Sequence, residues 1–198
     1  VDECVQIMGG AGFIEEYDAA TLYRDERINR IFEGTNEINR LLTSGASLKK
    51  ALLEDIPIRS TVVSRDKKWI PSIDVSDQRI KQEINVVEFC RSLTINTLNN
   101  LINSYGQDLK NEQWLLEPLS DMIISLSIID TCTKRYLQGD DKKKLDMLPV
   151  LKLSVANHYI SIMSNADDIA SNTDKEYKKT IVSNMKDLNY EVDRISLK

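Results

Sequence analysis

The sequence predicts an all-α protein, built mainly as an antiparallel helical bundle. From about residue 76 onward, apolar side chains recur at steps of three and four, the spacing of one helix face. Five of the seven glycines lie in residues 1–45, so the later chain has few interruptions. Residues 58–64 are the one candidate for a strand, and this segment is short.

Four apolar stripes follow one another in the second part of the chain. They consist of Ile80, Ile84, Val87, Leu98, Leu101 and Tyr105; of Leu115, Leu119, Met122, Leu126, Ile129 and Tyr136; of Val150, Leu153, Ile160 and Met163; and of Tyr177, Ile181, Met185, Leu188 and Val192. Each stripe needs an apolar partner, and four antiparallel helices provide one for each other. Gly106 and Gly139 are expected to end helices, and Pro118 and Pro149 to lie in first turns.

The chain is expected to divide into three parts. Residues 1–46 hold most of the glycines, residues 47–75 form a partly helical linker, and residues 76–198 form the four-helix part. Within the linker, residues 47–56 are predicted to form one amphipathic helix. The charged cluster at residues 140–144 is predicted to be a solvated loop between helices, because its acids and lysines largely cancel.

The composition argues against several classes of function. With 26 Lys and Arg against 31 Asp and Glu, the net charge of −5 disfavours a nucleic-acid-binding surface. An apolar run of about 18 residues is lacking, so no membrane-spanning helix is expected, and no secretory signal is visible. The three cysteines are widely spaced and His158 is the single histidine, so we expect no metal site. A reducing, intracellular compartment fits this cysteine usage.

One helical segment is interrupted at Glu33 and Gly34, and Thr35 is a candidate N-cap for a new helix running through Leu42. A carboxylate at such a break lies outside the helical hydrogen-bond ladder, close to free amides of the next helix. This arrangement suits a general base beside an oxyanion site, and it also suits a plain capping turn. The glycine-rich residues 6–13 lack a preceding strand, so by themselves they indicate a tight turn rather than a Rossmann phosphate loop.

Two strings carry a family resemblance. Residues 6–13 read Gln-Ile-Met-Gly-Gly-Ala-Gly-Phe, and residues 22–41 include Arg-Asp-Glu-Arg-Ile-Asn-Arg-Ile-Phe-Glu-Gly-Thr-Asn-Glu-Ile-Asn-Arg. Together they resemble the end of the C-terminal helical domain of the acyl-CoA dehydrogenase family. Members of this family use FAD to oxidise a fatty acyl-CoA to the trans-2-enoyl-CoA. The resemblance implies that Glu33 removes the α-proton, that its amide binds the thioester carbonyl, and that Gly34 lies against the substrate.

The resemblance also implies which residues contact FAD. Thr35, Asn36 and Glu37 match a stretch that contacts the diphosphate and adenosine region. A second stretch contacts FAD that is bound mainly by the partner subunit, and it consists of Gln6, Ile7, Met8, Gly9 and Gly10. The sequence departs from the family pattern at Asp18, where proline is common, and at Phe32, where tyrosine is frequent.

The N-terminal helical domain and central β-domain of the family have no counterpart in this sequence, so the chain resembles a C-terminal piece of a longer protein. We expect this piece alone neither to bind FAD tightly nor to turn over substrate. The helical extension after about residue 46 resembles the very-long-chain branch. That branch implies long acyl chains, a homodimer, and membrane attachment through the linker.

The resemblance implies a fatty acyl-CoA substrate, electron-transfer flavoprotein as electron acceptor, and the bacterial cytoplasm or the mitochondrial matrix as the compartment. A weak membrane-surface helix and a linker helix docked on protein are both open readings of the segment containing Leu48, Lys49, Lys50, Leu52, Leu53 and Ile56. Two alternatives to the dehydrogenase stay open. One is a helical assembly or membrane-docking module without its own catalysis, and the other is an acyl-CoA oxidase.

Overall fold

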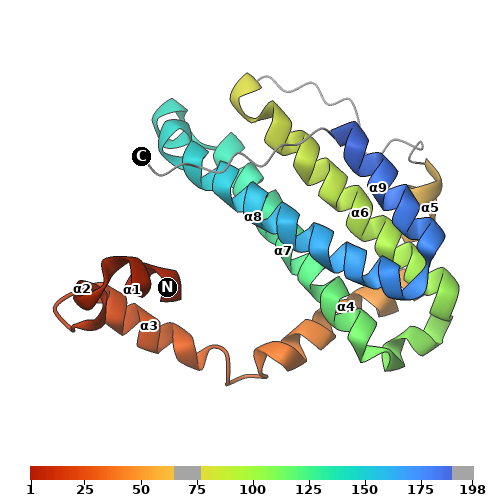
Figure 1. Cartoon of the computed structure of the whole chain (residues 1–198), viewed down its shortest axis with the longest axis horizontal. Helices are drawn as coiled ribbons and strands as arrows, with labels where there is room; N and C mark the ends of the chain where they lie inside the picture. The colour runs from red at the N-terminus through yellow and green to blue at the C-terminus, as the bar shows by residue number, and fades with distance from the viewer. Residues whose placement is uncertain (65–76, 189–198) are drawn as a thin grey trace. The chain divides into compact units, whose positions relative to one another are not determined.

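The computed structural model describes residues 1–64 and 77–188, and every regular element in these ranges is a helix (Figure 1). The predicted all-α class is therefore confirmed. The chain divides into two compact units, Val1–Leu42 and Thr43–Lys198. We refer to them as the N-terminal unit and the bundle unit. The predicted three-part division stays a prediction, and residues 65–75 of its linker lie outside the described residues.

The N-terminal unit consists of three short helices and the start of a fourth. They are α1 (Asp2–Met8), α2 (Gly10–Phe13), α3 (Asp18–Ile28) and the first residues of α4 (Asn36–Leu52). Helices α1 and α2 pack against α3 (Figure 1). Its described buried residues are all small, namely Gly12, Ala19 and Ala20. This unit therefore has almost no apolar core of its own.

The bundle unit contains the rest of α4 and a set of longer helices. They are α5 (Ile58–Ser64), η1 (Gln78–Ile80), α6 (Lys81–Tyr105), η2 (Gly106–Asn111), α7 (Gln113–Leu137), α8 (Asp141–Thr173) and α9 (Lys175–Leu188). Helices α6 to α9 run up and down in turn, with short connections (Figure 1). Helices α7 and α8 form a long hairpin, α6 packs against both, and α9 packs against α6 and α8.

The core of the bundle unit comes mainly from the first two predicted stripes. The third was wrong, because Val150, Leu153 and Ile160 are 48–64% exposed. Helix α8 has apolar residues at helical spacing on more than one face, and it buries the face with Leu151, Val155 and Ile162 instead. Leu101, Leu119, Ile129 and Ile162 are almost completely buried, and the Phe89 ring on α6 lies 6.3 Å from that of Tyr159 on α8. Burying one such side chain stabilises the fold by about 1.5–3 kcal/mol. The apolar faces therefore account for most of the packing of the bundle.

The hydroxyls of two tyrosines, buried Tyr136 and half-buried Tyr177, tie elements of the bundle unit together. The Tyr136 hydroxyl donates to Asp77 Oδ2 at 3.0 Å, and the Arg79 guanidinium holds the same carboxylate at 2.7 and 2.8 Å. The Tyr177 hydroxyl lies 2.9 Å from Thr97 Oγ1, which ties α9 to α6. Burial raises the pKa of Tyr177 well above its usual value. Both phenols therefore stay neutral and hydrogen-bonded.

Several local predictions were wrong. The strand candidate at 58–64 is helix α5, because the Pro57 carbonyl accepts from the Thr61 N–H at 3.0 Å and starts a helical turn. Pro118 and Pro149 lie inside α7 and α8 rather than in first turns. The residues four positions before these prolines are exposed, so water can satisfy the carbonyls that lose a helical partner.

Two predicted boundaries also moved. The helix predicted at 47–56 is the second part of α4, which continues through Gly45 without a break and ends at Leu52. The cluster at 140–144 is not a loop, because Asp140 caps α8 by accepting from the Lys143 N–H at 2.9 Å. A short polar side chain at a helix start replaces the missing helical partner of such an amide.

Candidate functional site

The end of α3 tightens before the predicted break. The amides of Ile31 and Phe32 both bond to the Ile28 carbonyl, at 2.9 and 3.2 Å. The next two residues, Glu33 and Gly34, adopt left-handed backbone with φ of 57° and 92°. A side-chain-bearing residue rarely takes this conformation, since its Cβ crowds the carbonyl oxygen. Glu33 is therefore held in an unusual conformation between two helices.

The start of α4 is capped from within. Thr35 Oγ1 accepts from the Ile38 N–H at 3.4 Å, and the Asn36 N–H donates to the Arg30 carbonyl at 3.3 Å. The Glu37 carboxylate accepts from its own backbone amide and from the Thr35 hydroxyl, which lowers its pKa. The sequence analysis expected free amides at this helix start, and these three are already hydrogen-bonded.

The turn itself leaves polar groups available. Within the described ranges, neither the Glu33 N–H nor its carboxylate has a hydrogen-bond or ion-pair partner, and the side chain is exposed. The Gly34 carbonyl accepts from the Asn39 side chain at 2.8 Å. An unpaired carboxylate can accept a proton, and an unpaired amide beside it can donate to an oxyanion that develops at the same place. The amides available for such a role are those of the turn rather than those of α4.

The second group of predicted residues forms the junction of α1 and α2. Gly9 has φ of 58°, and its amide donates to the Gln6 carbonyl at 3.2 Å. A Cβ built on Gly9 or Gly10 would meet nothing within 4 Å, whereas one on Gly12 would lie 2.6 Å from the Val5 carbonyl oxygen. Gly12 is thus required for helix packing, and Gly9 and Gly10 present open backbone.

The structure gathers the predicted residues into two groups and does not merge them. Gln6–Gly10 lie at the α1–α2 junction, near the start of α3, whereas Glu33–Glu37 follow the end of α3 (Figure 1). A cavity of about 450 Å³ lies beside the end of α3, and its lining includes Arg27, Arg30 and Asn36. Of the predicted site residues, Asn36 alone contributes to this cavity.

The sequence analysis missed Asn39. Its amide side chain reaches from the first turn of α4 back to the Gly34 carbonyl. The available signal was an asparagine five residues after the turn glycine, which is too common to single out without coordinates.

Comparisons with known proteins cover both groups of residues. Residues 1–48 match the family model described as "Acyl-CoA dehydrogenase, C-terminal domain". A probable acyl-CoA dehydrogenase of Bacillus subtilis is 34% identical over 137 residues, which are 68% of this chain and 23% of that protein. Residues 1–48 carry the pattern of the C-terminal domain of the acyl-CoA dehydrogenase family. The predicted resemblance is thereby confirmed.

Two further relatives show how the match to the acyl-CoA dehydrogenase family is distributed. The human mitochondrial very long-chain specific acyl-CoA dehydrogenase is 58% identical over 43 residues, 22% of this chain and 7% of that protein. The crystal structure of an acyl-CoA dehydrogenase from Bacillus anthracis, complexed with FAD, matches with a TM-score of 0.79 and 26% identity, covering 96% of this chain. The chain spans 33% of that structure and about a quarter of the Bacillus subtilis relative.

None of the helices in the described ranges combines the length and the apolar character that a membrane crossing requires. Within the same ranges, the structure contains no cluster of three or more His, Cys, Asp or Glu side chains that could hold a metal ion.

Proposed function

We propose that this chain forms the C-terminal part of an FAD-dependent acyl-CoA dehydrogenase that oxidises long-chain fatty acyl-CoA to the trans-2-enoyl-CoA, with Glu33 as the base. The observation that carries this proposal is the turn itself. Glu33 combines left-handed backbone, an unpaired carboxylate and an unpaired amide among the described residues, within the segment that matches the family. A plain capping turn requires none of these features at a glutamate.

The chemistry follows from the position of these groups. The Glu33 carboxylate accepts the α-proton of the thioester, and its N–H donates to the thioester carbonyl oxygen as negative charge develops there. Gly34 leaves room for the substrate because it has no Cβ. A bound acyl chain displaces water from the carboxylate, which disfavours its charged form and strengthens it as a base. FAD, when bound, accepts the hydride that leaves the β-carbon.

The residues present fit a flavin dinucleotide in part. Gly9 and Gly10 offer backbone with open space around it, which allows a flat cofactor to approach closely. Thr35 and Asn36 lie at the start of α4, where a helix dipole favours a diphosphate. The Glu37 N–H can donate to the diphosphate only after the Glu37 carboxylate releases it. The reason is that the carboxylate and the diphosphate compete for this one N–H.

The whole enzyme is proposed to act as a homodimer and to pass electrons to electron-transfer flavoprotein. Its relatives include a bacterial enzyme and a mitochondrial enzyme. We therefore place it in the bacterial cytoplasm or the mitochondrial matrix. The 198-residue chain alone is expected to hold no FAD and to be inactive. The reason is that Glu33 is solvated and the surrounding apolar side chains, such as Ile31 and Phe32, are exposed.

The test is Glu33→Gln in the full-length holoenzyme. Removing a general base lowers kcat by about 10²- to 10⁴-fold, while the FAD content and the melting temperature stay at the wild-type values. Glu54→Gln is the matched control, because Glu54 is also a glutamate with left-handed backbone (φ 62°) and lies outside the matched segment. Wild-type turnover by Glu33→Gln rejects the proposed role of Glu33.

A further inference from the structure

The Glu33 turn contains two successive left-handed residues, and this conformation has to be maintained by contacts. The backbone supplies one contact, because the Asn36 N–H closes the turn onto the Arg30 carbonyl at 3.3 Å. That bond spans the turn without touching the peptide between Gly34 and Thr35. This peptide follows the two left-handed residues, so fixing it limits the backbone angles that Gly34, and through it Glu33, can take.

The Asn39 side chain touches this peptide directly. Its Nδ2 donates to the Gly34 carbonyl oxygen at 2.8 Å, a short distance for such a bond. Its Oδ1 lies only 2.8 Å from the position that a Cβ on Gly34 would take. One amide group therefore holds the carbonyl of Gly34 and covers its Cα.

Asn39 is itself rigidly placed. Its backbone N–H donates to the Thr35 carbonyl at 2.9 Å, so the residue belongs to the first turn of α4. The Thr35 cap and the Glu37 carboxylate order the same turn. The side chain thus connects the first turn of α4 to the Glu33 turn.

We propose that Asn39 is a positioning residue for Glu33, and this proposal rests on the proposed function. Asn39 holds the Gly34 peptide in one orientation and so aims the Glu33 carboxylate and N–H at a common point. In this role Asn39 acts through the Gly34 peptide and not through a contact of its own with the substrate. A hydrogen bond at an exposed site contributes little to global stability, so its loss affects the rate more than the melting temperature.

The experiment compares Asn39→Ala and Asn39→Asp in the full-length holoenzyme, with palmitoyl-CoA and an artificial electron acceptor. The alanine removes the donor, and the aspartate keeps the shape but places a carboxylate against a carbonyl. We expect kcat to fall by about tenfold to a hundredfold, the cost of a small misplacement of a reacting group. KM should stay near the wild-type value, because no contact with substrate is lost.

Three further measurements separate positioning from a merely structural role. The acid limb of the kcat–pH profile of Asn39→Ala should differ from that of the wild type, whereas a merely structural role would leave it in place. FAD content and melting temperature stay at wild-type values. Asn172→Ala serves as the control, since Asn172 Nδ2 makes the same kind of bond, at 2.8 Å to the Asp168 carbonyl, on helix α8 of the bundle unit.

The outcomes are distinct. If Glu33→Gln is inactive and the Asn39 variants keep the wild-type kcat and pH profile, the positioning role is wrong and the proposed function stands. If the Asn39 variants lose FAD and stability along with activity, Asn39 is a structural residue and the inference is overturned. If Glu33→Gln itself retains activity, the proposed function and the role of Asn39 fail together.

Discussion

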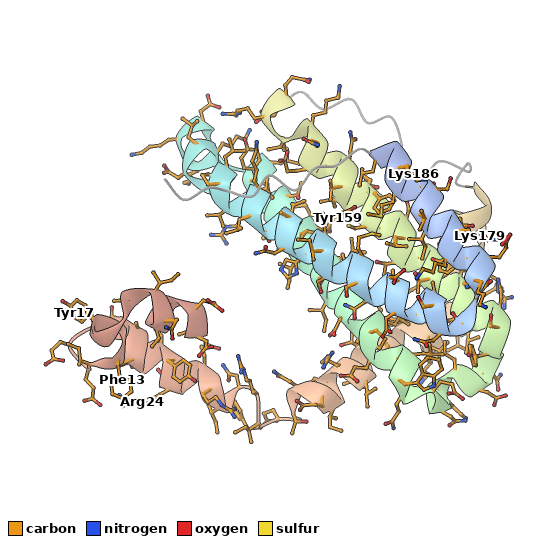
Figure 2. All side chains as sticks on the ribbon, in the orientation of Figure 1. Phe13, Tyr17, Arg24, Tyr159, Lys179 and Lys186 are labelled. Carbon is orange, nitrogen blue, oxygen red and sulfur yellow. The ribbon has the colours of Figure 1, made fainter. Side chains whose placement is uncertain are left out.

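The N-terminal unit and the bundle unit use their apolar residues in opposite ways. In the bundle unit, Leu93, Leu119 and Ile129 are completely buried between helices of the same unit. In the N-terminal unit, Ile7 and Phe13 are 84% and 80% exposed. Figure 2 labels the Phe13 side chain on this unit. Large exposed apolar groups on a soluble domain mark surfaces that pack against something else. The segment that matches the family model therefore includes the whole of the unit that has almost no core of its own.

The largest expected difference concerns independent folding. Residues 43–198, prepared alone, should unfold cooperatively on heating, because the apolar faces of their helices bury one another. A peptide of residues 1–42 should have little helix, since a chain of about 40 residues without a core or cross-links cannot offset its conformational entropy. Circular dichroism with thermal melting measures both. A cooperative melt of the short peptide contradicts the comparison.

A matched pair of leucines tests the same contrast at single-residue scale. Leu119→Ala should lower the free energy of unfolding by about 2–5 kcal/mol, because it leaves a cavity in a fully buried site. Leu22→Ala, at a position 52% exposed, should change it by less than about 0.5 kcal/mol. Urea titration of the 198-residue chain measures both values. Equal effects from the two variants would show that the N-terminal unit has a core as well.

Much of the bundle was predictable, because burial imposes a period on the sequence. The stripe containing Leu119 and Ile129 gave the position of α7 and the face that it buries. The extent of α4 was harder to predict. A glycine often marks the end of a helix, but Gly45 lies within α4. Its backbone is not left-handed, and a Cβ built on it would meet nothing within 4 Å, so the structure does not require a glycine there. Local composition cannot distinguish such a glycine from one that ends a helix.

The candidate site was predictable in part for a similar reason. The break at Glu33 and Gly34 follows from a glycine and a capping threonine in succession, and both left-handed residues lie there. The hydrogen bonds that occupy the amides of Asn36 and Ile38 depend on how the chain turns back, so sequence spacing did not predict them. The bond from Asn39 was missed for the same reason.

A pair of glycines in and next to α4 gives the next largest effect. Gly34→Ala should destabilise the turn by about 1–2 kcal/mol, because φ is 92° and the new Cβ would meet Asn39 Oδ1 at 2.8 Å. Gly45→Ala should stabilise α4 by about 0.5–1 kcal/mol, since nothing lies within 4 Å of the added Cβ. Amide hydrogen exchange of α4 and of the turn measures both. If both substitutions slow the amide hydrogen exchange of neighbouring residues, alanine fits the Gly34 turn without strain.

The smallest expected effect comes from a carboxylate that contrasts with Glu33. Asp77 accepts two bonds from the Arg79 guanidinium and one from the Tyr136 hydroxyl, and the arginine in particular holds its pKa well below the usual range. A lowered pKa in the folded state means that ionised Asp77 contributes its full stability above the unfolded pKa of about 3.9 and loses it as the pH falls further.

Asp77→Asn should therefore lower the melting temperature by a few degrees at neutral pH, and the difference from wild type should narrow below about pH 4. Thermal melts of the 198-residue chain across pH 3–8 measure this, with Asp146→Asn on the exposed side of α8 as the control. A difference that is unchanged at pH 3 would mean that the charge of Asp77 does not hold the start of α6 against α7, and that the bundle unit relies on its apolar faces alone.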